Sequence, residues 1–197
     1  VYGWGGKPSE CWPRALELAK LAIAVDDDES WGHWALAGYC RFHRQFDQAE
    51  REYRKAIELN SNDADVMADF AYLLTLTGRA KEAIENMLRA MRLNPHYPSW
   101  YAAGLAHAYY ECQMFDAAVQ ILESPEGADT ALSLLFLAAS HAALENSVAA
   151  AAAIKRVLDV DPGATISRWA TLERIAYQHE SDLQKLRSHL HQAGLPE

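Results

Sequence analysis

The sequence predicts an all-α fold, and more specifically a right-handed α-solenoid of stacked antiparallel helix pairs. The first observation is an internal repeat, because one template begins at Phe46, Ala80 and Phe115, with a fainter copy at Ser147. The second is that apolar residues recur at helical spacing almost throughout, whereas no segment alternates as a strand would. A repeat of about 34 residues is typical of small helical units that bury their apolar faces only by stacking on one another.

The composition is that of a soluble, folded chain and argues against two classes of partner. Half of the 197 residues are hydrophobic, and 18 Lys and Arg stand against 27 Asp and Glu, which gives a net charge of −9. Because phosphate backbones are bound by clustered basic residues, we expect no nucleic-acid partner. No apolar run reaches the roughly 18 residues that a bilayer crossing needs, so we expect no membrane partner.

The cysteines and the first residues bear on the cellular compartment. Cys11, Cys40 and Cys112 are odd in number and far apart, which predicts neither a disulfide framework nor a zinc site. The opening VYGWGG lacks the charged and apolar regions of a signal peptide. We therefore expect a cytoplasmic protein in a reducing setting.

The expected helix boundaries follow from breaks in the apolar pattern. Gly78 supplies a left-handed helix end, and prolines such as Pro95 and Pro162 prevent the preceding helix from continuing. The acidic run 26–29 stands just before an expected helix, where carboxylates cap exposed amides. The helices are expected at 9–25, 29–43, 46–59, 63–77, 80–93, 97–112, 115–124, 128–144, 147–159, 164–178 and 180–193.

Small and large residues recur in a way that predicts the core. Alanines in the first helix of each pair let neighbouring helices approach, and large residues beside them fill the remaining space. In each second helix a large residue follows the repeated alanine by four positions, one turn along the same face. The expected core residues are Leu36, Ala37, Ala49, Tyr53, Phe70, Ala71, Ala83, Met87, Leu105, Ala106, Ala118, Leu122, Leu137, Ala138, Ala150 and Ile154.

These positions resemble the tetratricopeptide repeat, most clearly at 64–97. The residues that carry the resemblance there are Phe70, Ala71, Gly78, Ala83, Ala90 and Pro95. The resemblance implies full repeats at 30–63, 64–97, 98–130 (with a shortened second helix) and 131–164. It also implies the end of a lost helix plus a loop at 1–8, a half repeat at 9–28 and a capping helix pair at 165–197. Because a half repeat leaves a raw end, we expect the chain to be part of a longer protein.

A narrower resemblance lies in three phrases of the sequence. The run VYGWGG followed by LAIAVDDDESWGHWALAG, the phrase MRLNPHYPSWYAAGLAHAYY and the ending LHQAGLPE are similar to tetratricopeptide tails of bacterial class III adenylate or guanylate cyclases. Such tails sometimes follow a winged-helix DNA-binding domain instead. The resemblance implies a regulatory segment. No cyclase metal ligand or catalytic residue is carried over, because that domain is absent from the sequence.

The first helices are expected to line the concave face of the solenoid, which in this family usually receives a peptide. Aromatic and arginine side chains are the usual anchors of such surfaces, because they bury much area at modest entropic cost. The opposing interpretation is that the tryptophans only pack between adjacent helices. The candidate partner-binding residues are Trp31, Trp34, Arg41, Tyr72, Trp100, His107 and Tyr110.

Other kinds of site find little support. His189 and His191 stand two apart on an expected helix and therefore point in different directions, which suits a metal poorly. The sequence has neither a GxSxG elbow nor a glycine-rich phosphate loop followed by Lys. Cys40 lies near His43, but it occupies a core-facing position and is expected to pack as a small hydrophobe. We therefore expect no metal, no cofactor and no enzyme activity.

The sequence thus predicts a non-catalytic protein–protein interaction module, a regulatory or scaffolding segment of a bacterial signalling protein. Tetratricopeptide clamps for terminal carboxylates present Lys and Asn where this chain has Trp34, Gly38, Ala68 and Tyr72, so an apolar or aromatic ligand is expected. Two alternatives stay open. One is a small-molecule sensor that regulates an attached cyclase or transcription-factor domain, which an enclosed polar pocket would favour. The other is a structural module that forms a homodimer.

Overall fold

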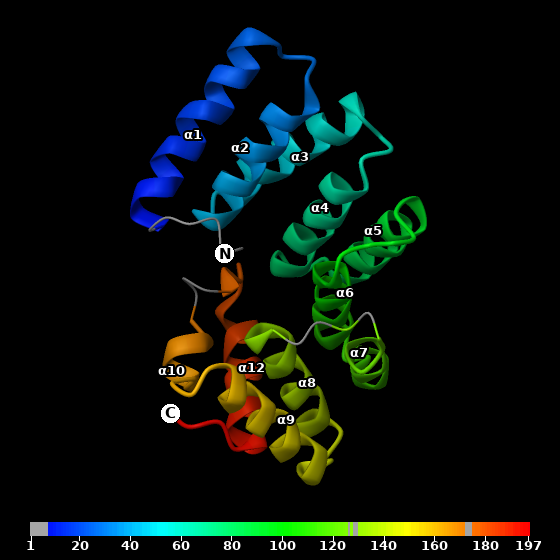
Figure 1. The fold of residues 1–197 in the computed structure, drawn as a ribbon, viewed down its shortest axis with the longest axis vertical. Helices are drawn as coiled ribbons and strands as arrows, with labels where there is room; N and C mark the ends of the chain where they lie inside the picture. The colour runs from blue at the N-terminus through cyan, green and yellow to red at the C-terminus, as the bar shows by residue number, and fades with distance from the viewer. Residues whose placement is uncertain (1–7, 126, 128–129, 172–174) are drawn as a thin grey trace.

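The computed structural model describes residues 8–125, 127, 130–171 and 175–197, which form helices joined by turns (Figure 1). In chain order the helices are α1 (Pro8–Val25), α2 (Ser30–Phe42), α3 (Phe46–Leu59), α4 (Ala64–Leu76), α5 (Ala80–Leu93), α6 (Ser99–Glu111), α7 (Phe115–Leu122), α8 (Ala131–Ala143), α9 (Ser147–Val160), α10 (Ile166–Trp169) and α12 (Glu180–Ala193). Among the described helices, none combines the length and the hydrophobicity that a membrane crossing requires.

The helices pair and stack in sequence order. Within each pair α2 packs on α3, α4 on α5, α6 on α7 and α8 on α9, and each pair packs on the next. The first helices α2, α4, α6 and α8 follow one another along the stack, and the second helices α3, α5 and α7 lie along one side of them (Figure 1). The expected α-solenoid of helix pairs is confirmed.

One turn geometry joins the first helix to the second in all four pairs. The turn residue, at equivalent places in the repeat, has a positive φ of 58° to 79° in Arg44, Gly78, Gln113 and Glu145. The following amide donates to the carbonyl five residues earlier, as in Arg79 N–H to Leu74 O at 2.8 Å and Asn146 N–H to His141 O at 2.9 Å. This pattern satisfies helix-end carbonyls. The repeat therefore keeps the turn even where glycine has been replaced.

Alanines mark the places where helices approach most closely. The repeated alanines Ala49, Ala83, Ala118 and Ala150 are completely buried, and the large residue one turn later is also buried in each second helix. Cys40 is buried with them, as its core-facing position predicts. Burial of each of these large side chains stabilises the stack by roughly 1.5–3 kcal/mol.

The region after α9 differs from the expectation of one helix over 164–178. Helix α10 ends at Trp169, and Ala176 has a φ of 60°, which a continuous helix does not allow. The amide of Gln178 donates to the carbonyl of Leu76 at 2.9 Å, so the chain at this point is held by α4 rather than by its own helix. A tertiary contact therefore overrides the local helical pattern.

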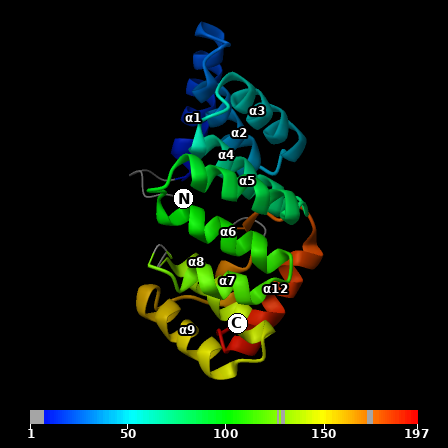
Figure 2. The ribbon, with the colours of Figure 1, turned by 90° about the vertical axis from the view of Figure 1, so that its right-hand side faces the viewer.

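The stretch from Ile175 to Ala193, which we name the C-terminal segment, lies against the first helices of the second half of the stack. Helix α12 packs mainly on α8, and also on α9, and the views agree on this position (Figures 1 and 2). Leu183, Leu186 and Leu190 are buried in the contact. The segment therefore belongs to the core of the second half and covers part of its first-helix face.

Candidate functional site

The first helices place the candidate residues at equivalent positions on one face of the stack. On the N-terminal half, Trp31 is 59% exposed, while Trp34 and Tyr72 are half-buried. Trp100 is half-buried where α6 begins. On the C-terminal half His107 and Tyr110 are buried. The face is thus open in its first half and closed in its second.

A half-buried carboxylate fixes the orientation of two candidates. Asp69 on α4 accepts a hydrogen bond from the indole N–H of Trp34 at 3.1 Å and from the guanidinium of Arg41 at 3.1 Å. It also accepts one from the hydroxyl of Tyr53 at 2.7 Å. The side chain of Arg41 therefore serves to hold α2, α3 and α4 together. Sequence reasoning missed Asp69, although a lone Asp within the apolar run of α4 is the signal that could have found it.

Trp31 and Trp34 form a pair at the start of α2. Their rings meet edge to face, with centroids 5.3 Å apart and planes at 80°. Because the indole N–H of Trp34 donates to Asp69, the orientation of that ring is fixed, and the Trp31 ring packs against it. Such rigid aromatic groups offer contact area at low entropic cost.

Open space lies one turn along α2 from this pair. A Cβ atom added at Gly38 would meet nothing within 4 Å. The equivalent position on α4 is Tyr72, over whose ring the Arg41 guanidinium lies at 5.0 Å from the centroid. Gly38, which lacks a side chain, therefore leaves open space on α2 at the position that Tyr72 occupies on α4. We name Trp31, Trp34, Gly38, Tyr72 and Trp100 the aromatic surface.

His107 and Tyr110 differ from the expectation that they line an open groove. The Nε2 atom of His107 lies 2.7 Å from the hydroxyl of Tyr177, and its ring stacks on Phe136 at 4.2 Å between centroids. The hydroxyl of Tyr110 lies 2.7 Å from Nδ1 of His189. Both side chains thus point toward the expected face, but the C-terminal segment covers them.

Glu111 is the polar centre of that contact. Its carboxylate accepts hydrogen bonds from the hydroxyl of Tyr177 and from Nζ of Lys185, the latter at 2.5 Å. Burial alone would raise the pKa of Glu111, but the donors His107, Lys185 and Tyr177 outweigh it and hold the pKa below its usual value. The C-terminal segment is therefore joined to α6 by a buried, charge-assisted network as well as by leucines.

Two residues of the acidic run 26–29, which precedes α2, have local structural roles. The side chain of Glu29 caps the helix by accepting from the Trp31 amide at 2.8 Å, as expected. The buried His33 ring lies 2.7 Å from a Glu52 carboxylate oxygen and 3.2 Å from the Asp27 carbonyl. Burial opposes the charged imidazole, but these partners raise the pKa of His33. Asp26 and Asp28 remain exposed at the end of α2 that carries Trp31.

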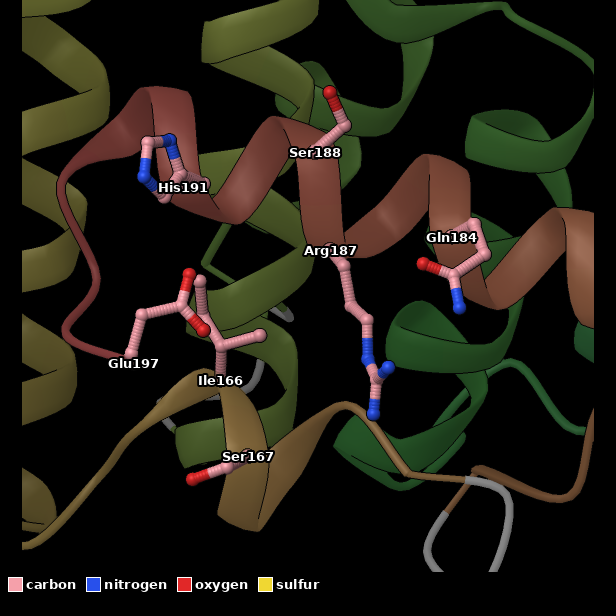
Figure 3. A pocket seen from close by; sticks show the side chains of 7 residues that line it. All are labelled: Ile166, Ser167, Gln184, Arg187, Ser188, His191 and Glu197. Atoms are coloured by element: carbon pink, nitrogen blue, oxygen red, sulfur yellow. The ribbon is translucent and has the colours of Figure 1, made fainter.

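Two hollows on the described surface lie away from the aromatic surface. One, of about 430 Å³, is bounded by α10 and α12, and Figure 3 shows Arg187 extending from α12 toward the chain after α10. That arginine donates to the carbonyl of Ala170 at 2.8 Å, so it serves the fold. The other, of about 480 Å³, lies between the turns at Gly78 and Gln113. Neither hollow is lined by the candidate residues.

Within the part of the chain that the structure describes, no group of three or more His, Cys, Asp or Glu side chains is placed to hold a metal ion. His189 instead packs edge-on against Tyr110, and burial together with the nearby Lys185 lowers its pKa. The histidine thus serves the contact of the C-terminal segment.

One helix pair matches a known family, and the whole fold is shared with solved structures. Residues 64–97 match the tetratricopeptide repeat model. No curated protein matches the sequence significantly. PilW, described as a widely conserved type IV pilus biogenesis factor, is 14% identical with a TM-score of 0.72, over 94% of this chain and 82% of that one.

Two further structures share the fold. YrrB, described as a TPR protein with an unusual peptide-binding site, is 16% identical with a TM-score of 0.60, over 79% of this chain and 80% of that one. MamA from Desulfovibrio magneticus RS-1 is 15% identical with a TM-score of 0.58, over 83% and 92%. Residues 64–97 therefore match a tetratricopeptide repeat, and the chain around them shares the α-solenoid fold of these structures.

Proposed function

We propose that this chain is a non-catalytic interaction module whose aromatic surface docks a segment of a partner protein. The observation that carries the proposal is the exposure of Trp31 beside a fixed Trp34, next to the open space at Gly38. A single exposed apolar residue needs no explanation, whereas an exposed aromatic pair beside an uncovered stretch of helix offers a partner a surface on which to bury a side chain. The YrrB structure supports the proposal by analogy, because it is described as having a peptide-binding site on the same fold.

The covered half of the first-helix face limits the length of the docked segment. Tyr177, Leu183, Leu186 and Leu190 are almost completely buried between the C-terminal segment and the stack. Burial of each of these side chains stabilises the contact by roughly 1.5–3 kcal/mol. A weakly binding peptide therefore does not displace the segment. We therefore propose a short partner segment that spans α2, α4 and the start of α6.

The biological setting that we propose follows the sequence resemblance to bacterial cyclase tails. In that setting the module is a regulatory or scaffolding segment of a cytoplasmic signalling protein. The exposed aromatic surface is what such a segment needs to capture a partner.

The proposal is tested by selecting a phage-displayed library of random 12-residue peptides on the purified chain. Selected peptides should lose binding at least tenfold to Trp31→Ala and to Gly38→Leu, which places a side chain in the open space beside the tryptophan pair. Val148→Ala is the matched control, because Val148 is exposed on α9, away from the aromatic surface. Circular dichroism and the melting temperature should be unchanged in all three variants. Equal binding of the selected peptides to Trp31→Ala and wild type would overturn the proposal.

A further inference from the structure

Positive charge is absent from most of the first-helix face. The sequence contains no Lys or Arg at 21–40, 56–78 or 93–154, ranges that include all of α4, α6 and α8 and most of α2. The one lysine or arginine on these four helices is Arg41, and Asp69 pairs with it at 3.1 Å, while His33 on α2 is buried against Glu52. The first helices therefore offer no unpaired lysine or arginine to a ligand.

Carboxylates gather at the edge of the aromatic surface. Asp26, Asp27, Asp28 and Glu29 precede α2 and are all exposed. At the equivalent end of α4 stand Asp63, which caps the helix, and Asp65, which accepts from Tyr101 at 2.5 Å. The N-terminal ends of α2 and α4 thus carry carboxylates and no lysine or arginine, and the exposed Trp31 lies beside those of α2.

The second helices show that this bias is not a property of the whole chain. Helix α3 carries Arg51, Arg54 and Lys55, and helix α5 carries Lys81, Arg89 and Arg92. These cations are interspersed with carboxylates, as in the ion pair of Arg54 with Glu50 at 2.7 Å. Lysine and arginine are therefore depleted on the first helices, which the proposed function uses, but not on α3 and α5.

We infer that the partner segment is basic, with an apolar or aromatic side chain flanked by lysine or arginine. This inference rests on the proposed function and names the class of its ligand. The apolar side chain packs against Trp31 and Trp34 over the open space at Gly38, and the cations reach Asp26 and Asp28. A lysine or arginine can also lie on the open face of Trp31, since cations are attracted to the face of an indole ring. An acidic segment would be repelled at the same edge.

The two residues chosen for the test are Asp26 and Asp28, because changing them to Asn preserves the local turn. The Oδ1 atom of Asp26 accepts from the Asp28 amide at 3.1 Å, and an Asn oxygen can replace it. The matched control is Glu58→Gln with Glu85→Gln, which removes the same charge from exposed positions of α3 and α5. A purely nonspecific effect of net charge would appear equally in both double variants.

The experiment resynthesises the peptides recovered from the 12-residue library with each Lys and Arg changed to Gln or to Glu. We expect the recovered peptides to be basic and to bind three- to tenfold more weakly to Asp26→Asn/Asp28→Asn than to wild type, and the Gln versions to lose a similar factor. The Glu versions should not bind, and raising NaCl should weaken the basic peptides. The control variant should bind like wild type.

Two failures are distinguishable. If the recovered peptides depend on Trp31 but are neutral or acidic, or bind Asp26→Asn/Asp28→Asn unchanged, the inference about charge is overturned while the proposed function stands. If no recovered peptide depends on Trp31, both are overturned.

Discussion

Tyr177 donates a hydrogen bond to Glu111 across the contact between the C-terminal segment and α6. The two residues lie 66 positions apart in the sequence. Tyr177 is completely buried, and its hydroxyl also meets Nε2 of His107 at 2.7 Å. The Tyr177 hydroxyl thus links the C-terminal segment to Glu111 and His107, in a network that covers the second half of the first-helix face.

The first prediction concerns that phenol. Tyr177→Phe keeps the ring but removes the hydroxyl, which leaves His107 and Glu111 each with one fewer partner. We expect the free energy of unfolding to fall by about 1–3 kcal/mol, measured by urea denaturation. Tyr109→Phe is the control, because Tyr109 is half-buried on α6, the helix that carries His107 and Glu111, and its hydroxyl makes no hydrogen bond in the described structure. Equal effects of the two variants would contradict a specific role for the Tyr177 hydroxyl.

The second prediction concerns acid. The pKa of Glu111 is lowered in the folded chain from a usual value of 4.5, so its carboxylate stabilises the fold at pH values above 4.5. This stabilisation is lost as the pH falls below 4.5 and through the folded pKa, because the proton then binds the unfolded chain more readily. Glu111→Gln lacks this titration, so the stability difference between wild type and variant should shrink between about pH 5 and pH 3. Parallel stability curves over that range would contradict the assignment.

A third prediction concerns Asp69. Asp69→Ala leaves the guanidinium of Arg41 without its ion pair and the indole of Trp34 without its acceptor. We expect a loss of about 3 kcal/mol in the free energy of unfolding, since removing one partner of a largely buried pair leaves the other uncompensated. Trp34 should also become more mobile, which time-resolved fluorescence anisotropy can measure. Asp159→Ala, at an exposed position on α9, should change neither quantity.

The fourth prediction is a gain in stability. Glu145 adopts a φ of 58°, a left-handed conformation that is unfavourable for a residue with a Cβ atom. Glu145→Gly should therefore stabilise the chain by about 0.5–1 kcal/mol, after allowance for the greater freedom of glycine in the unfolded state. Glu145→Ala retains the Cβ atom and should give no such gain. A rise in the urea midpoint for both variants alike would show that turn strain is not the cause.

Much of the fold could be predicted from the sequence, because its information is local and repeated. Alanine spacing places Ala49, Ala83 and Ala118 in the core, and the structure buries all three completely. The prediction of one helix over 164–178 is wrong because tertiary contacts, which no local sequence pattern contains, decide the path of the chain there. The amide of Gln178 donates to Leu76 on α4 and the hydroxyl of Tyr177 donates to Glu111 on α6, and the chain bends at Ala176 to make these contacts. The division of the chain into repeats beyond 64–97 stays a prediction.

The candidate site could be predicted only in part. Repeat register correctly puts Trp31, Trp34 and Tyr72 on first helices, but register alone does not show which neighbour holds or covers a side chain. Asp69 anchors Trp34 from the next repeat, and His189 covers Tyr110 from 79 positions away. Contacts between distant segments therefore decide which part of the face is open. Whether the open residues bind a partner stays a proposal.

The bond between Gln178 and Leu76 has a consequence for how the chain folds during synthesis. A solenoid held only by neighbouring repeats can fold progressively as each repeat leaves the ribosome. Here the second half stays incomplete until the C-terminal segment has emerged, because α6 and α8 lack their cover before then. Closing such a distant contact slows folding and leaves apolar surface open in the nascent chain. Ribosome-bound chains arrested before residue 175 should therefore recruit chaperones, whereas the released chain should not.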